Sequence, residues 1–322
     1  MSARRRYIWF PARRRAPTEP RPATPRSSTT TTTPAQRPSI LLTGASGNLG
    51  RELLDRLLAH GARVRCLTRG QTRPQPGVEW VTGDLTDAAT MRTALVGIDT
   101  VFLIWPRLES APARALIAEL ATAAPRVVYL SSTAIDDSRA VQSDPIVAVH
   151  ADLEATLGEA GLDPAVLRCD TLASNARGWA AQLRAGDVIA GPRAAASAIV
   201  DERDVADAAT MVLLTPPTRL DQGPYLLTGP EILSRAEQIA HLGAALGRDL
   251  HFQHLPSHLA RTRMLADGRP EPLVDALITA SDQRPDSSLI TDHVLRLTGR
   301  PARRFSTWAI DRAGEFHRPT PA

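Results

Sequence analysis

The sequence predicts an α/β protein, with a doubly wound parallel sheet followed by a smaller, mainly helical C-terminal lobe. Three observations support this fold class. Short β-rich apolar runs alternate with helical segments from Ser39 onward, a glycine-rich turn joins the first run to the first helix, and the alternation loosens beyond about residue 170. Such alternation is typical of βαβ units, whose strands lie parallel in one sheet.

The expected strands are short apolar runs, and the expected helices carry apolar residues at three- and four-residue spacing. In the core we place strands near 39–43, 63–68, 78–81, 99–105, 126–131 and 164–169, and helices near 48–59, 87–96, 110–123 and 148–160. In the lobe we place short strands near 186–190, 225–228 and 250–254. The domain prediction is a core over 39–170 and a substrate lobe over 171–322, the two contributing to one compact unit.

Residues 1–38 differ in composition from the rest of the chain and are expected to be disordered. They are rich in Arg, Pro and Thr and lack helical or strand periodicity. They hold nine Arg and one Glu, whereas the rest of the chain has 29 basic and 33 acidic residues. The folded part is therefore mildly acidic, which disfavours a nucleic-acid groove there. A targeting or nucleic-acid-binding arm is the alternative for the extension itself.

Composition also limits the compartment and the chemistry. No apolar run approaches the length needed to cross a bilayer, and Cys66 and Cys169 form neither a disulfide framework nor a Cys-x-x-Cys pair for a metal. We therefore expect a cytoplasmic protein without a metal site or a membrane partner. The chain contains no lysine. That absence excludes a Walker-type lysine, a Schiff-base lysine and a Tyr-x-x-x-Lys proton relay, because arginine stays protonated and cannot act as a base.

A glycine-rich turn predicts a dinucleotide site on a Rossmann-type sheet. The turn follows the strand at 39–43 and consists of Thr43, Gly44, Ala45, Ser46, Gly47, Asn48, Leu49 and Gly50. Gly44 permits the tight turn, Gly47 admits the pyrophosphate to the backbone, and Gly50 lets helix and strand pack closely. The phosphates would lie against free N–H groups at the positive end of the helix dipole. All of these residues except Ala45 are candidate cofactor residues.

The ends of the next two strands supply further cofactor candidates. An NAD-selective site places a carboxylate after the second strand, but no acidic residue lies between Asp55 and Glu79. Arg69 stands there instead, and a guanidinium pairs well with a 2′-phosphate, so NADP(H) is preferred over NAD(H). After the third strand, Asp84 can accept a hydrogen bond from the adenine amine, and Leu85 can pack on the ring.

With these residues placed, the sequence resembles the NmrA-like, atypical branch of the short-chain dehydrogenase/reductase superfamily. The resemblance covers residues 40 to about 316. Besides the glycine turn and Gly83-Asp84-Leu85, it includes Tyr129-Leu130-Ser131-Ser132, His150-x-x-x-Glu154, Ala160-Gly161-Leu162, Val166-Leu167-Arg168, Asn175, residues 200–206 and Leu227-Thr228-Gly229-Pro230. It implies a Rossmann core, NADP(H) or NAD(H) binding, and a substrate cleft between core and lobe. Where typical superfamily members carry Tyr-x-x-x-Lys, this chain has Val147 and Ala151, neither of which moves a proton.

We interpret the chain as an NADP(H)-dependent reductase of an activated small-molecule acceptor, such as an iminium, a quinone or an enone. Hydride chemistry belongs to the cofactor, so such acceptors tolerate the missing tyrosine. Ser131 and His150 are the catalytic candidates; Ser131 is also expected beside the nicotinamide, with Trp105 covering it. Structural roles are the alternatives, because Ser131 ends a strand and His150 lies on a packed helix.

Two other function classes stay open from the sequence. A non-catalytic, NAD(P)-sensing regulator that binds a protein partner fits the missing tyrosine and lysine. A sugar-nucleotide epimerase or dehydratase fits less well, because those reactions also need a base at that position.

Overall fold

The computed structural model describes residues 38–70, 74–221 and 223–317 of the chain. The chain divides into two units, Met1–Gln36 and Arg37–Ala322, and all described elements belong to the second. The predicted basic extension lies outside the described residues apart from Pro38. Over the three described ranges, no helix is both long enough and apolar enough to cross a membrane.

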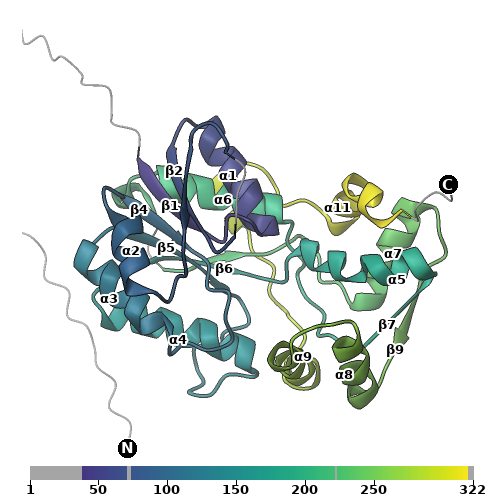
Figure 1. The fold of residues 1–322 in the computed structure, drawn as a ribbon. Helices are drawn as coiled ribbons and strands as arrows, with labels where there is room; N and C mark the ends of the chain where they lie inside the picture. Colours follow the sequence, from purple (N-terminus) through teal and green to yellow (C-terminus); the bar gives the residue numbers. More distant parts are fainter. Residues whose placement is uncertain (1–37, 71–73, 222, 318–322) are drawn as a thin grey trace, which may run out of the picture. The chain divides into compact units, whose positions relative to one another are not determined.

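A seven-stranded parallel sheet forms the centre of this unit and confirms the predicted α/β class (Figure 1). Its strands are β1 (Ser39–Thr43), β2 (Arg63–Thr68), β3 (Val78–Thr82), β4 (Thr100–Leu103), β5 (Arg126–Ser132), β6 (Ala165–Cys169) and β8 (Tyr225–Leu227). Their order is β3-β2-β1-β4-β5-β6-β8, and every neighbouring pair is parallel. The order reverses between β1 and β4, and ligands bind outside the carboxyl ends of strands at such a point.

Helices cover both faces of the sheet (Figure 1). One face carries α1 (Asn48–Ala59) and α6 (Glu202–Leu214), and the other carries α2 (Ala88–Leu95), α3 (Ala113–Ala123) and α4 (Pro145–Glu159). Successive residues of β1 point to opposite faces, so Ile40 and Leu42 pack in the core under α1 while Leu41 packs in the core under α3. Strands buried on both faces carry continuous apolar runs, which is why the sequence predicts them so closely.

The C-terminal lobe has a third, smaller core. Its elements are η1 (Ala173–Trp179), α5 (Ala180–Ala185), β7 (Val188–Gly191), α7 (Arg235–Leu246), β9 (His251–His254), α8 (Ser257–Ala266), α9 (Glu271–Gln283), α11 (Phe305–Asp311) and η3 (Ala313–Phe316). β7 and β9 pair in parallel as a separate two-stranded sheet. Trp308 is fully buried and stacks on Phe305 with ring centroids 5.5 Å apart. The lobe is mainly helical, as predicted.

Part of the region predicted as the lobe belongs to the main sheet instead. β8, expected near 225–228 as a lobe strand, pairs with β6 and forms the edge of the seven-stranded sheet. α6 packs against α1, and α10 (His293–Thr298) packs against both α6 and β8. The sheet therefore extends past the predicted limit at residue 170. A short strand carries no local signal of which sheet it joins, so the sequence pattern could not predict this boundary.

The helix α4 begins three residues earlier than predicted because its cap lies further upstream. The Asp144 side chain accepts hydrogen bonds from the N–H groups of Ile146 and Val147, at 3.1 and 3.2 Å. Pro145 occupies the first helical position, where its missing N–H costs no hydrogen bond. Cap and proline together fix the start of the helix at the carboxyl edge of the sheet.

The first turn depends on a close approach of α1 to β1. A Cβ at Gly50 would lie 2.1 Å from the carbonyl oxygen of Gly44 and 2.8 Å from the Cα of Ala45. Gly44 itself has a φ of 71°, in the left-handed region that favours glycine. Backbone atoms thus fill the space that a side chain at Gly50 would need, so helix and strand can approach this closely only through glycine.

We expect Gly50→Ala to lower the free energy of unfolding by about 3 kcal/mol, because the backbone must move to admit the methyl group. Chemical denaturation measures the change. Gly158→Ala in α4 is the matched control: nothing lies within 4 Å of its Cβ position. That variant should gain about 0.5 kcal/mol from the reduced freedom of the unfolded chain. Similar stabilities of the two variants would contradict the close approach.

Candidate active site

The glycine-rich turn presents an uncapped helix end at the carboxyl edge of the sheet. Gly47 is the N-cap of α1, no described side chain caps this end, and its first turn contains no acidic residue. Ser46, Gly47 and Asn48 are exposed. The turn is closed from within by the Gly47 N–H, which donates to the Gly44 carbonyl at 3.0 Å. Free first-turn N–H groups and the positive helix end fit an anion such as a pyrophosphate.

Two predicted cofactor residues, Thr43 and Leu49, connect the turn to the sheet and to the core. Thr43 is buried; its hydroxyl donates to the Phe102 carbonyl at 3.1 Å and accepts from the Ile104 N–H at 2.7 Å. The side chain of Leu49 is buried in the core between α1 and the sheet. The Thr43 hydroxyl is therefore used to tie β1 to β4, and Leu49 offers a ligand only its backbone.

Beyond β2 and β3, Arg69 and Asp84 lie near an arginine that the sequence pattern did not indicate. Asp84 Oδ1 accepts hydrogen bonds from the N–H and hydroxyl of Thr86, at 2.8 and 2.7 Å. Arg107 Nη2 lies 3.3 Å from Asp84 Oδ2. The Thr86 hydrogen bonds lower the pKa of Asp84, and the charges of Arg107 and Arg69 act in the same direction.

These contacts add a second arginine to the end of the site where the adenosine is expected. Asp84 is already bonded within the chain, and Arg69 is exposed with no hydrogen bond or ion pair in the described part of the chain. Two guanidiniums, Arg69 and Arg107, thus stand near Asp84 where the sequence indicated one. Arg107 lies in the loop beyond β4, where no periodic pattern predicts direction. Leu85 is half-buried against the core of α2, α3 and α4.

Trp105, predicted to cover the nicotinamide, turns into the core instead. Its side chain is 5% exposed, and its Nε1 donates to the Glu109 carbonyl at 2.9 Å. β4 ends at Leu103, so the strand alternation does not extend to residue 105. Ile104 lies beside the turn in its place, with Cδ1 3.1 Å from where a Cβ of Gly44 would be.

Ser131 belongs to an ion-pair network at the carboxyl end of β5. Its hydroxyl donates to Glu154 Oε1 at 2.5 Å. Arg168 binds both oxygens of Glu154, at 2.9 and 2.7 Å, and both oxygens of Asp137, at 2.7 Å each. The hydrogen bonds from Asp137 and Glu154 raise the pKa of Arg168. Ser131 is only 2% exposed, so its proton is committed to Glu154 rather than to a substrate oxygen.

His150 is held neutral beside Tyr129. The Tyr129 hydroxyl and His150 Nδ1 are 3.0 Å apart. Burial lowers the pKa of His150 to about 4, although the nearby Glu154 carboxylate acts in the opposite direction. Burial also raises the pKa of Tyr129. The imidazole therefore carries no acid proton at neutral pH, which argues against the predicted role of His150 as a proton donor.

Two contacts join the lobe to the carboxyl edge of the sheet. Arg284, which follows α9, binds both oxygens of the buried Asp144, at 2.9 and 2.8 Å. Burial alone would raise the pKa of Asp144, but these hydrogen bonds and the charge of Arg284 lower it overall. The Ser287 hydroxyl donates to Asp170 at 3.2 Å, directly after β6. The start of α4 and the end of β6 are thereby both tied to the lobe.

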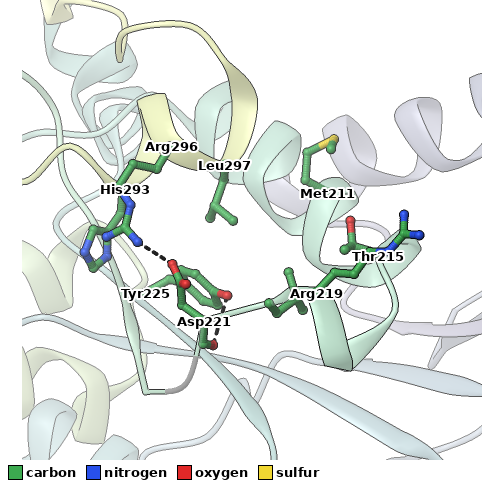
Figure 2. Close-up of a pocket in the computed structure, with 9 residues that line it drawn as sticks. Met211, Thr215, Arg219, Asp221, Tyr225, His293, Arg296 and Leu297 are labelled. Carbon is green, nitrogen blue, oxygen red and sulfur yellow. Dashed lines mark hydrogen bonds and ion pairs between the residues drawn. The ribbon is translucent and has the colours of Figure 1, made fainter. Parts of the chain in front are cut away.

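The pocket in Figure 2 lies at the opposite edge of the sheet. It has a volume of about 220 Å³ and is lined by residues around the ends of α6 and α10 and by Tyr225. Tyr225 is the first residue of a parallel strand, so the pocket is at the amino edge, away from the dinucleotide turn. The Asp221 carboxylate binds Arg296 there, and the Asp221 backbone carbonyl accepts a hydrogen bond from the Tyr225 hydroxyl. A second hollow, of about 600 Å³, lies between α4, residues 139–145 and α9.

Among the described residues, no group of three or more His, Cys, Asp or Glu side chains could hold a metal ion. The candidate site at the carboxyl edge thus consists of a glycine turn with an uncapped helix end, two arginines at the expected adenosine end, and a network of Ser131, Glu154 and Arg168 at the other end.

Known proteins resemble this chain over most of its length. A model of the NmrA-like family matches residues 36–286. The chain is 34% identical over 284 residues to a (4-alkanoyl-5-oxo-2,5-dihydrofuran-3-yl)methyl phosphate reductase of Streptomyces griseus, a match that covers 86% of this chain and 99% of that protein. It is 29% identical over 287 residues to an NAD(P)H azoreductase of Xenophilus azovorans, with the same coverage of 86% and 99%. The structure of a Citrobacter triphenylmethane reductase complexed with NADP(H) superposes with a TM-score of 0.69 at 19% identity, covering 85% of this chain and 99% of that one.

Removal of His150 should flatten the pH dependence of stability between about pH 6.5 and pH 4. The unfolded ring has a pKa near 6.5 and the folded ring one of about 4, so the unfolded chain binds the proton first and stability falls as the pH drops through this window. The full loss in the wild type is about 3 kcal/mol. Urea unfolding at several pH values should show a smaller loss in His150→Gln. His258→Gln, which changes an exposed ring of α8, should keep the wild-type slope; the same slope in both variants would contradict a His150 that is neutral in the folded protein.

Proposed function

Since the chain belongs to the NmrA-like family, we propose that it is an NAD(P)H-dependent reductase of a conjugated carbonyl acceptor, of the acyl-butenolide class. One observation carries the proposal: the match to the furanone phosphate reductase spans 99% of that protein at 34% identity. The azoreductase relative also uses NAD(P)H. The proposal keeps the enone among the three acceptor types expected from the sequence.

The turn after β1 supports binding of the dinucleotide. Its uncapped helix end and its exposed backbone at 46–48 suit a pyrophosphate, and the glycine at position 50 keeps that end close to the sheet. Arg69 and Arg107 support a preference for NADPH, because guanidiniums pair with a 2′-phosphate and no carboxylate lies between residues 56 and 78 to hold a 2′-hydroxyl.

The acceptor class follows from the absence of the tyrosine and lysine that usually supply a proton. Val147 and Ala151 stand where a tyrosine and a lysine would supply a proton, and Val147 is fully buried. When bound, the dinucleotide would supply a hydride; the β-carbon of the acceptor would take it, the π electrons would move onto the carbonyl oxygen, and a proton from solvent would complete the saturated product. Two carbonyls on one carbon of the double bond spread the developing charge, so this acceptor needs little help from an acid.

The ion-pair network at the end of β5 forms a fixed wall of the site in this proposal and does not protonate the acceptor. Ser131 and Glu154 are fixed by Arg168, whose guanidinium contacts two carboxylates and stays charged. A prearranged network of this kind holds its geometry without reorganising during the reaction. The protein then contributes the position of the acceptor.

A non-catalytic NAD(P) sensor that acts on a protein partner is the second candidate. The missing tyrosine and lysine favour it, and so does the low pKa of His150, which removes the remaining histidine acid near β5. Tight binding of both NADPH and NADP⁺, without turnover of any acceptor, would select the sensor.

Activity on a panel of acceptors tests the reductase. Loss of NADPH absorbance should be followed with an acyl-butenolide, a quinone, an iminium and an azo dye. We expect kcat/KM for the acyl-butenolide to exceed that for the other acceptors by about tenfold, a difference of roughly 1.4 kcal/mol in transition-state binding. NADPH binding without reduction of any of the four would defeat the proposal.

Arg69→Ala should weaken NADPH binding by about tenfold or more and NADH binding by less than about twofold, because only NADPH carries the 2′-phosphate. Fluorescence titration measures both affinities. Arg107→Ala should show the same selectivity, since its guanidinium stands in the same cluster. Arg114→Ala, an exposed arginine of α3, is the charge-matched control. Equal losses for the two nucleotides would remove Arg69 from this role.

A further inference from the structure

Two half-buried arginines of the lobe have no carboxylate partner among the described residues. Beyond β6, all the other half-buried arginines in the described residues form an ion pair with Asp or Glu; these are Arg177, Arg203, Arg248, Arg261, Arg284, Arg303 and Arg312. Arg235 and Arg269 are the exceptions among those residues. A guanidinium withdrawn from water needs an anion, so an unpaired one points to a ligand.

Arg235, the first residue of α7, is held between two aromatic rings. Its guanidinium carbon lies 5.9 Å from the ring centroid of Trp179 and 5.9 Å from that of Phe252. Its Nη1 donates to the Pro192 carbonyl at 3.1 Å. A Cβ at Gly191 would lie 3.2 Å from the same nitrogen, so glycine leaves room for it. The rings fix the guanidinium plane but do not neutralise its charge.

Arg269, in the loop between α8 and α9, brings a second cation to the same place. Its Nη2 would be 3.6 Å from a Cβ at Gly178, the residue before Trp179. Its side chain forms no hydrogen bond or ion pair within the described ranges. Burial lowers the pKa of Arg235, and the charge of Arg269 lowers it further. The two positive charges therefore repel each other, and neither forms an ion pair with a described carboxylate.

Trp179 and Gly178, which the two arginines approach, lie on the segment that leads from the carboxyl edge of the sheet into the lobe. η1 begins four residues after the end of β6, and the Ala173 N–H donates to the Val200 carbonyl there. Four extended residues span at most about 14 Å and six 3₁₀ steps about 12 Å, so Trp179 lies within about 26 Å of that edge. The arginines thus stand beside the segment that joins the lobe to the candidate site.

We propose that Arg235 and Arg269 form an anion subsite that binds the phosphate of a phosphorylated acceptor. This inference rests on the proposed function, because it assigns to the pair the phosphate that the 34% identical reductase has in its substrate. Planar guanidiniums bind phosphate oxygens in bidentate fashion, and the Trp179 and Phe252 rings keep one of them oriented for it. A phosphate dianion supplies the two negative charges that this pair lacks.

Two acceptors that differ only in the phosphate test the subsite. The probes are a (4-alkanoyl-5-oxo-2,5-dihydrofuran-3-yl)methyl phosphate and the corresponding alcohol. We expect the wild type to show a KM for the phosphate at least about tenfold below that for the alcohol. Arg235→Gln and Arg269→Gln should each raise the KM for the phosphate about tenfold with little change in kcat, and leave the KM for the alcohol unchanged. Arg184→Gln, an exposed arginine of α5, should change neither value.

A binding measurement separates this subsite from the activity. Inorganic phosphate, added with saturating NADP⁺ so that the cofactor's own phosphate positions are filled, should raise the melting temperature of the wild type and of Arg184→Gln but not of Arg269→Gln. An unchanged affinity for NADPH in each variant shows that it is folded. Equal KM values for the two acceptors in the wild type, or equal losses for both in the variants, would overturn the subsite while leaving the reductase intact. If neither acceptor is reduced, the proposed function fails, and the phosphate titration decides the subsite alone.

Discussion

The approach of α1 to β1 across Gly44 and Gly50 is the constraint on which the cofactor half of the protein depends. It places an uncapped helix end at the carboxyl edge of the sheet, where the strand order reverses. Thr43 fixes the same turn from the other side through its hydrogen bonds to β4. The turn is thus held by two neighbouring elements and presents its backbone N–H groups without help from a side chain. The exposed residues 46–48 remain available for a ligand.

Electrostatics at the other end of the site is unusual because the chain has no lysine. Its permanent cations are arginines, which hold charge but do not move protons. Two titratable groups near β5 are shifted away from neutrality: burial lowers the pKa of His150 to about 4 and raises that of the Cys169 thiol to about 12. Such a site suits a reaction in which the acceptor stabilises its own developing charge. It does not suit sugar-nucleotide epimerisation, which needs a base.

Ion pairs also connect the end of the chain to the cofactor half. Arg312, after α11, binds Glu52 of α1 at 2.6 Å, and Arg56 of the same helix binds Asp207 of α6 at 2.5 Å. Arg303 binds Asp204 of α6. The helix that carries the dinucleotide turn is therefore held by an ion pair to α6 and by one to Arg312 of the lobe. The other half-buried arginines described beyond β6 pair with a carboxylate, whereas Arg235 and Arg269 do not. This difference is why we assign these two to a ligand.

The sequence by itself determined the fold class, the bounds of β1, β2 and α1, and the glycine turn, because each is decided by residues close together in the chain. The absence of lysine likewise excludes a Tyr-x-x-x-Lys relay, since no arrangement of the chain can supply the missing amine. The tertiary structure alone decided that Trp105 points into the core, that Ser131 is bonded to Glu154, that β8 joins the main sheet, and that Arg107, Arg235 and Arg269 lie beside candidate ligand positions. Direction, burial and charge pairing depend on partners distant in sequence, and no local pattern encodes them.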